Sequence, residues 1–180
     1  METKIIYFVH GTTTDNASKL CSGWKEAMLN ELGIEQAKNL GNVIKEKGIK
    51  FDVIFTSDLK RAIDSSNIAF TEYEKIRENR LRECNYGDLD GQHKSLVVYE
   101  EHIDKAFPNG ESLKDVEKRM REFIEVLKQN YLSKTIGIVA HRAPQLALEV
   151  ITKGISWEEA INNDWRKTGD WQPGWEYIIK

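Results

Sequence analysis

The chain has 180 residues, against roughly 150 for an average domain, so we expect one domain that spans residues 1–180. Its 26 lysines and arginines and 29 aspartates and glutamates give a net charge of −3, which argues against a protein that binds nucleic acid or an anionic membrane. Hydrophobic residues make up 40% of the chain, and no apolar run approaches the roughly 18 residues of a membrane span. We therefore expect a globular protein in which any anionic ligand is bound by a local site.

The N-terminal segment and the cysteines favour a cytosolic location. The apolar stretch 5–9 is too short for the core of a signal peptide, and no small-residue cleavage pattern follows it. Cys21 and Cys84 form no CxxC pair and have no histidines at zinc-binding spacing. Two reduced thiols are therefore expected, with a disulfide between them as the less favoured alternative.

Short runs rich in β-branched and aromatic residues alternate with segments of helical periodicity. The runs expected to form strands are 4–9, 52–56, 135–140 and 175–179. The predicted helices begin at Asn30, Leu59, Ser112, Pro144 and Trp157. Gly48 is expected to stop the first helix, and Asp115 to complete a capping box with Ser112. This order predicts a three-layer α/β/α sandwich with a mostly parallel central sheet.

The C-terminal region is rich in aromatic residues. They are Trp157, Trp165, Trp171, Trp175 and Tyr177. Such clusters usually pack helices against a sheet, so a packing role is favoured over a lid. Arg166 and Lys167 lie within this region and are candidates for contact with an anionic substrate, although their spacing does not require it.

Two histidines follow predicted buried strands directly. His10 comes after the strand 4–9, and His141 comes after the strand 135–140. Ligands of open α/β sheets bind beyond the carboxyl ends of the strands, where residues 57–61 are also expected. Two imidazoles at one edge indicate acid–base or nucleophilic chemistry. The alternative for each histidine is that it caps its strand and hydrogen-bonds a backbone carbonyl.

A series of motifs, in order, resembles the signatures of the histidine phosphatase superfamily, which has the phosphoglycerate-mutase-like fold. Residues 8–16, FVHGTTTDN, resemble its R-H-G-E-T-x-x-N, and residues 51–62 resemble its F-D-x-I-x-S-S-x-L-x-R-A. Similar matches occur at 23–37 (G-W…L-T-x-x-G-x-x-Q-A), 81–91 (L-x-E-x-x-x-G-x-x-E-G), 110–112 (G-E-S) and 138–141 (V-V-S-H). The resemblance runs from about residue 4 to residue 151.

The resemblance implies that His10 attacks a phosphate and forms a phosphohistidine, which water then hydrolyses. His141 and Arg61 would hold the equatorial phosphoryl oxygens. Glu83 would protonate the leaving alkoxide and then activate water. Gly11 and Asn16 are expected to bind the phosphate. The hydroxyl of Thr12 is a further candidate, with a turn-forming role as its alternative. No metal or other cofactor is implied, because cationic side chains supply the charge, and the expected partner is a small phosphorylated substrate.

Three of these roles have structural alternatives. Arg61 is also consistent with a solvated residue on the surface of a helix. Glu83 stands among charged neighbours and is consistent with a member of a surface ion-pair cluster. Asn16 is consistent with a cap or turn residue after the first strand.

The signature is broken at two positions. Val9 stands where the family has arginine, and Thr12 where it has glutamate. Valine cannot grip phosphate oxygens as a guanidinium does, and loss of one transition-state donor typically costs on the order of 3 kcal/mol. We predict that Arg142, which follows His141, restores the lost contact. The alternative is a solvent-facing loop arginine.

The sequence therefore favours a phosphatase. Hydrolysis is preferred over mutase-type phosphoryl transfer because the middle of the chain is short for the insertions that mutases carry. An α/β-hydrolase is disfavoured because no G-x-S-x-G motif occurs. A family member that binds a phosphorylated ligand without turnover is the alternative that Val9 and Thr12 keep open. No motif specifies the substrate or the oligomeric state.

Overall fold

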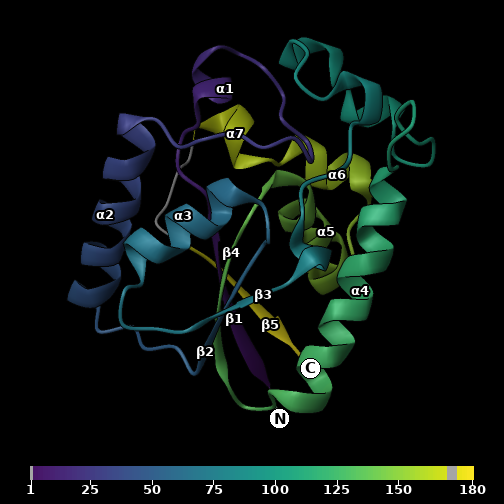
Figure 1. Ribbon diagram of the computed structural model, residues 1–180. Coiled ribbons are helices and arrows are strands. Elements are labelled where there is room, and N and C mark those ends of the chain that lie inside the picture. Colours follow the sequence, from purple (N-terminus) through teal and green to yellow (C-terminus); the bar gives the residue numbers. More distant parts are fainter. Residues whose placement is uncertain (1, 170–173) are drawn as a thin grey trace.

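The computed structural model of the protein describes residues 2–169 and 174–180. Five strands in these residues form a sheet in the order β3-β2-β4-β1-β5 (Figure 1). The strands are β1 (Thr3–Val9), β2 (Val53–Thr56), β3 (Lys75–Arg77), β4 (Thr135–Ala140) and β5 (Trp175–Ile179). All the pairings in this described sheet are parallel except that of β1 with β5. The prediction of a mostly parallel sheet is confirmed.

Helices lie between and around these strands. They are α1 (Thr14–Ala17), α2 (Glu31–Glu46), α3 (Lys60–Ala69), α4 (Leu113–Asn130), α5 (Arg142–Lys153), α6 (Trp157–Asn162) and α7 (Trp165–Thr168). Within the described ranges, none of the helices combines the length and the apolar content needed to cross a bilayer.

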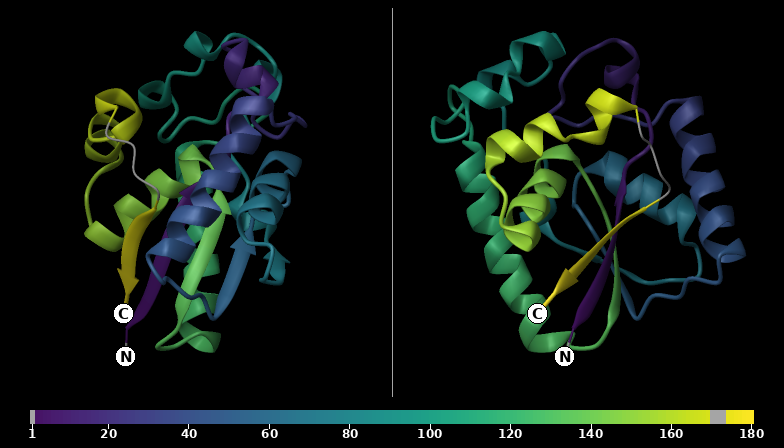
Figure 2. Two further views of the ribbon diagram at one scale, coloured as in Figure 1. Left: turned by 90° about the vertical axis from the view of Figure 1, so that its left-hand side faces the viewer. Right: turned by 180° about the vertical axis from the view of Figure 1, so that it is seen from behind.

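Side chains of β1 point alternately to the two faces of the sheet. Ile5 and Tyr7 join a hydrophobic cluster with residues of α4 and α5, whereas Ile6 and Phe8 join a second cluster with residues of α2 and α3. The helices consequently cover both faces of the sheet (Figure 2). This arrangement confirms the three-layer α/β/α sandwich.

Most helix start signals read from the sequence correspond to hydrogen-bonded caps. The side-chain oxygen of Asn30 accepts from the N–H of Gly33 at the start of α2. Ser112 and Asp115 form the predicted capping box at the start of α4, and Ser156 caps α6. Polar side chains thus satisfy N–H groups that the first turn leaves without a helical partner.

The predicted start of α5 is wrong by two residues. The helix begins at Arg142 rather than at Pro144, and His141 is its N-cap. The free N–H groups of Arg142 and Ala143 donate to the carboxylate of Glu83, which allows the helix to begin earlier. Pro144 then lies in the first turn, where its missing N–H costs nothing.

Several short elements were not predicted. They are α1, α7, β3 and the 3-10 helices η1 (Asn79–Leu81), η2 (Gly87–Leu89), η3 (Lys94–Leu96) and η4 (Tyr99–Glu101). Each is too short to show a periodicity in the sequence. In Figure 1, α1, α7 and the teal segment with η2 to η4 gather beyond the carboxyl ends of β1 and β4.

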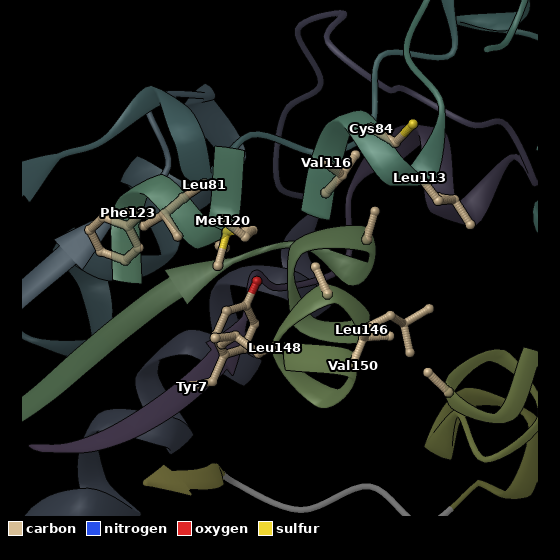
Figure 3. Packing of buried hydrophobic residues seen from close by; sticks show 14 of the residues in the cluster. Tyr7, Leu81, Cys84, Leu113, Val116, Met120, Phe123, Leu146, Leu148 and Val150 are labelled. Carbon is tan, nitrogen blue, oxygen red and sulfur yellow. The ribbon is translucent and has the colours of Figure 1, made fainter. Parts of the chain in front are cut away.

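The larger hydrophobic cluster lies between the sheet and α4 and α5. Figure 3 shows Tyr7 of β1, Met120 and Phe123 of α4, and Leu146 of α5 within it. Tyr7, Met120 and Phe123 are completely buried. The sheet edge that carries the histidines is therefore supported by a packed core.

The aromatic residues of the C-terminal region mostly pack as predicted. Trp157 and Tyr177 are buried, and Trp165 stacks on Trp175 with 4.8 Å between ring centroids. Trp171 lies outside the described residues. The prediction of two reduced thiols is confirmed, because Cys21 and Cys84 are both free and lie in buried positions.

Candidate active site

The carboxyl ends of β1, β2 and β4 meet at one edge of the sheet. Val9 of β1 is paired with Ala140 of β4, so that His10 and His141 follow at the same level. Their ring centroids are 5.1 Å apart. Ser57, which follows β2, has its Oγ 2.8 Å from Nε2 of His141. The fold thus brings together the strand-end residues that the sequence singled out.

The imidazole of His10 is held in one tautomer. Its Nδ1 lies 2.7 Å from the carbonyl oxygen of Gly11, and because a carbonyl only accepts, Nδ1 carries the proton. Burial of the ring, together with the charge of Arg61, lowers the pKa of His10 to about 3. At neutral pH the ring is therefore uncharged, and Nε2 keeps the lone pair that a nucleophile needs.

His141 is completely buried behind this ring. The backbone N–H of His141 donates to the hydroxyl of Tyr7 at 3.0 Å, and that hydroxyl donates to the backbone carbonyl of His141 at 2.7 Å. Burial, and then the charges of Arg61 and His10, lower the pKa of His141. Its Nδ1 has no hydrogen-bond partner within the described ranges. A polar atom buried in this way is costly, and an oxygen of a bound phosphate would supply a partner.

Arg61 lies in the first turn of α3, with 3% of its surface exposed. Its Nη2 donates to the carbonyl of Gly23 at 2.7 Å, and its Nη1 to the carbonyl of Lys25 at 3.1 Å. These bonds fix the plane of the guanidinium and use two of its five N–H donors. Burial of the side chain rules out the interpretation of Arg61 as a solvated helix residue.

Glu83 follows η1 and is 8% exposed. One carboxylate oxygen accepts from the N–H groups of Cys84 and Ala143, both at 2.9 Å, and the other accepts from the N–H of Arg142 at 3.2 Å. The carboxylate is therefore fixed against the first turn of α5, directly after His141.

The charged neighbours of Glu83 have other partners. Arg80 forms an ion pair with Glu78 at 2.6 Å, and Arg82 forms one with Asp58 at 2.7 Å. The interpretation of Glu83 as a member of this surface cluster is wrong, because its carboxylate binds backbone N–H groups instead.

One cavity of about 190 Å³ joins most of these groups. From the predicted set it is lined by His10, Asn16, Arg61, Glu83 and Arg142. Tyr86 and Lys94 also line it and were missed by sequence reasoning. Lys94 lies in a polar stretch without periodicity, which gave no signal. Tyr86 lies three residues after Glu83, and this proximity was a weak signal of its position.

Asn16 both lines this cavity and takes part in the capping box of α1, whose N-cap is Thr13. Its side-chain oxygen accepts from the N–H of Thr13 at 3.1 Å, and its own N–H donates to the hydroxyl of Thr13 at 3.0 Å. The capping alternative is therefore correct for the oxygen of Asn16. A substrate contact by this side chain would have to come from its Nδ2.

Gly11 and Thr12 lie outside the cavity. The N–H and the hydroxyl of Thr12 both donate to the side-chain oxygen of Gln36, at 2.8 and 3.0 Å. The N–H of Gly11 donates to the hydroxyl of Ser65 at 2.9 Å. Both residues line a second cavity of about 160 Å³ together with Val9. Their donors are thus engaged in holding the loop after β1, and Gly11 acts on the site through the His10 ring.

Arg142 extends to the wall of the first cavity from the first turn of α5. Its Nε donates to Asp164 at 2.6 Å, and its guanidinium lies 4.3 Å from the ring centroid of Tyr99. It is therefore not a solvent-facing loop residue. That it replaces the arginine missing at position 9 stays a prediction.

Comparisons with known proteins show which family the chain belongs to. The family model described as the histidine phosphatase superfamily (branch 1) matches residues 6–169. The chain is 31% identical over 172 residues to the phosphoglycerate mutase of Schizosaccharomyces pombe, covering 86% of this chain and 82% of that one. It is 32% identical over 173 residues to the 2,3-bisphosphoglycerate-dependent phosphoglycerate mutase of Methylorubrum extorquens, covering 87% and 82%. The crystal structure of the α-ribazole phosphatase from Shigella flexneri matches with a TM-score of 0.76 and 26% identity, covering 90% and 84%.

The fold is thus that of the phosphoglycerate-mutase-like α/β proteins. The chain belongs to the histidine phosphatase superfamily. The relatives named above are mutases and a phosphatase, and the superfamily acts on small phosphorylated substrates.

Proposed function

We propose that this protein is a phosphomonoesterase that works through a phosphohistidine on His10. The observation that carries the proposal is the state of the His10 ring, which is neutral, with Nδ1–H bound to Gly11 and the lone pair on Nε2. A fixed, uncharged imidazole beside a buried guanidinium is suited to attack phosphorus.

In the first step, Nε2 of His10 forms a bond to phosphorus while the bond from phosphorus to the ester oxygen breaks. Arg61, which lines the cavity, and His141, whose ring adjoins that of His10, stabilise the charge on the equatorial oxygens. Asn16 and Arg142 line the same cavity and contribute further donors. The cationic side chains supply the charge stabilisation, so the proposed reaction needs no metal.

Glu83 acts as the general acid of the first step and as the general base of the second. Its protonated form gives a proton to the leaving alkoxide, and the resulting carboxylate takes one from the water that hydrolyses the phosphohistidine. The backbone bonds that fix Glu83 against α5 support this role, since they hold the carboxyl group at the wall of the cavity that contains His10. The cavity, at about 190 Å³, suits a small phosphorylated substrate.

The test is hydrolysis of p-nitrophenyl phosphate in the presence of EDTA by the wild type and by His10→Ala. We expect turnover by the wild type and none by the variant. Brief incubation with labelled substrate should trap a phosphoenzyme that is labile in acid and stable in base, as phosphohistidine is. Binding of phosphate without turnover or phosphoenzyme would instead favour a ligand-binding family member.

A mutase is the second candidate, because the relatives at 31% and 32% identity are phosphoglycerate mutases. In a mutase the phosphohistidine returns its phosphoryl group to a hydroxyl of the bound product. Incubation of the phosphoenzyme with 3-phosphoglycerate distinguishes the two. Release of inorganic phosphate supports hydrolysis, and formation of a bisphosphoglycerate supports transfer.

A further inference from the structure

Asp164 joins two arginines from different helices at the edge of the active site. Its carboxylate is 2% exposed, and one oxygen accepts from Nε of Arg142 at 2.6 Å. The other oxygen accepts from Nη1 of Arg166 at 2.9 Å. One carboxylate charge thus faces two guanidinium charges, and the group keeps a net positive charge.

The two arginines lie against different aromatic rings. Arg142 lies over Tyr99 of η4 and lines the cavity of His10. Arg166 lies over the ring of Trp165, 4.4 Å from its centroid. The two guanidinium groups therefore pack against different elements, Arg142 against η4 and Arg166 against α7.

Arg166 lies against a residue that adjoins the end of β1. Trp165, beneath its guanidinium, lines the second cavity of about 160 Å³ together with Val9 and His10. Nη2 of Arg166 donates at 3.1 Å to Gln145, which lies in the first turn of α5, close after His141. The pKa of His10 is lowered mainly by burial and then by the charge of Arg61, and the charge of Arg166 adds a smaller contribution. The guanidinium is therefore within electrostatic range of the imidazole.

We propose that Arg166 is a phosphate-binding residue that supplies the guanidinium missing at position 9. This inference rests on the proposed function, in which a phosphoryl group is bound at His10. Val9 offers no donor there, whereas Arg166 has five N–H donors, of which the bonds to Asp164 and Gln145 use two. Arg61 and Arg166 then hold the phosphoryl oxygens from two directions, with Asp164 and Gln145 fixing the second guanidinium.

A purely structural role for Arg166 makes a different prediction. As a brace between α7 and α5, Arg166 would contribute to stability, and its loss would leave anion affinity unchanged. Binding measurements that do not depend on turnover separate the two roles.

The experiment is calorimetric titration of the folded protein with orthovanadate, which resembles the phosphoryl group during transfer. The variants are Arg166→Gln, which removes the charge, and Arg166→Lys, which keeps it without the guanidinium fork. The matched control is Lys167→Gln. Lys167 is the next residue, is exposed, and pairs with Glu100 at 3.3 Å, so its loss reports any general effect of one positive charge.

We expect Arg166→Gln to raise the Kd for orthovanadate roughly tenfold to a hundredfold, as loss of a charge-assisted hydrogen bond would. Arg166→Lys should fall between it and the wild type, and Lys167→Gln should match the wild type. If Arg166→Gln does not give a cooperative melting transition, Arg166→Lys alone decides the question, and a wild-type Kd in that variant overturns the proposal.

The outcomes also separate this inference from the proposed function. Orthovanadate affinity that depends on Arg166, in a protein that forms no phosphohistidine, supports the assignment and overturns the phosphatase. Turnover by the wild type together with equal Kd values for Arg166→Gln and Lys167→Gln overturns the assignment and leaves the phosphatase standing. A wild type that binds no orthovanadate overturns both.

Discussion

Glu83 accepts a hydrogen bond at 2.9 Å from the N–H of Ala143, which lies 60 residues further along the chain. This contact links the segment after η1 to the first turn of α5, whose N-cap is His141. The carboxyl group and the second histidine are thereby positioned by the same helix start. The roles proposed for them depend on this link.

Replacement of Glu83 by glutamine should make the phosphohistidine accumulate, because the second step is slowed more than the first. p-Nitrophenolate leaves readily without a proton, so Nε2 of His10 can still be phosphorylated, but water is no longer activated. We expect one burst of nitrophenolate per enzyme molecule, followed by turnover reduced about 10²- to 10⁴-fold. With an alkyl phosphate, whose leaving group needs the proton, no burst is expected.

Stopped-flow measurement of nitrophenolate checks this prediction, and the exposed residue Glu101, changed to glutamine, is the control. Thermal melting of Glu83→Gln is needed alongside, because its amide would face backbone N–H groups. A folded variant with wild-type steady-state turnover would remove Glu83 from the proton-transfer steps.

Stability should depend on pH through the two histidines. The pKa of His10 is lowered from 6.5 to about 3, and that of His141 is lowered as well. Between about pH 3 and 6.5 the unfolded chain therefore binds more protons than the folded one. The contribution of these histidines to the free energy of unfolding should be complete above pH 6.5. It should decrease as the pH falls toward 3, by at most about 1.4 kcal/mol per pH unit for each histidine.

Urea unfolding at pH 7, 6 and 5 measures this dependence. His10→Asn should show a smaller loss of stability between pH 7 and pH 5 than the wild type, since one titrating group is gone. Identical slopes in the two proteins would mean that His10 is not held neutral by the fold.

The residues that could be predicted are those fixed by strand periodicity and strand ends. The strands 135–140 and 175–179 have the predicted bounds. His10 and His141 meet because parallel strands in register end at the same level, a rule that needs no side-chain detail. Arg61 lies in the segment 57–61 that the strand-end rule also selects, but its role was identified through the family resemblance. Glu83 was identified only through that resemblance, since its local sequence also suits a charged surface.

The residues that could not be predicted are placed by contacts between distant segments. Thr12 turns from the cavity to Gln36, 24 residues away. Arg142 is joined to Asp164, 22 residues away, on a short loop before α7. Neither contact leaves a periodic trace in the sequence. The role of a side chain after a strand therefore depended on partners that only the fold brings near.

Gly33→Ala should damage the loop that carries His10. A Cβ on Gly33 would lie 2.1 Å from the carbonyl oxygen of Thr12, a backbone atom that cannot move without shifting the loop. The gain of about 1 kcal/mol in helix propensity from alanine is smaller than the cost of such an overlap. We expect a lower melting temperature and reduced hydrolysis of p-nitrophenyl phosphate.

Glu35→Ala, at an exposed position on the same helix, is the control and should leave both quantities near wild type. A Gly33→Ala protein that melts at a higher temperature than the wild type, as propensity alone would give, would contradict the close approach of α2 to the loop.

Arg142→Ala tests whether the residue after the second histidine binds substrate. The substitution keeps the backbone N–H that donates to Glu83, and Asp164 retains Arg166 as a partner, so no buried charge is left alone. We expect KM for p-nitrophenyl phosphate to rise tenfold to a hundredfold, with a smaller change in kcat. Arg121→Ala is the matched control, because that side chain is 55% exposed on α4. An unchanged KM in Arg142→Ala would show that its guanidinium, although at the cavity wall, makes no contact with the phosphate. The compensation for Val9 would then rest on Arg166 alone, the other arginine bound to Asp164.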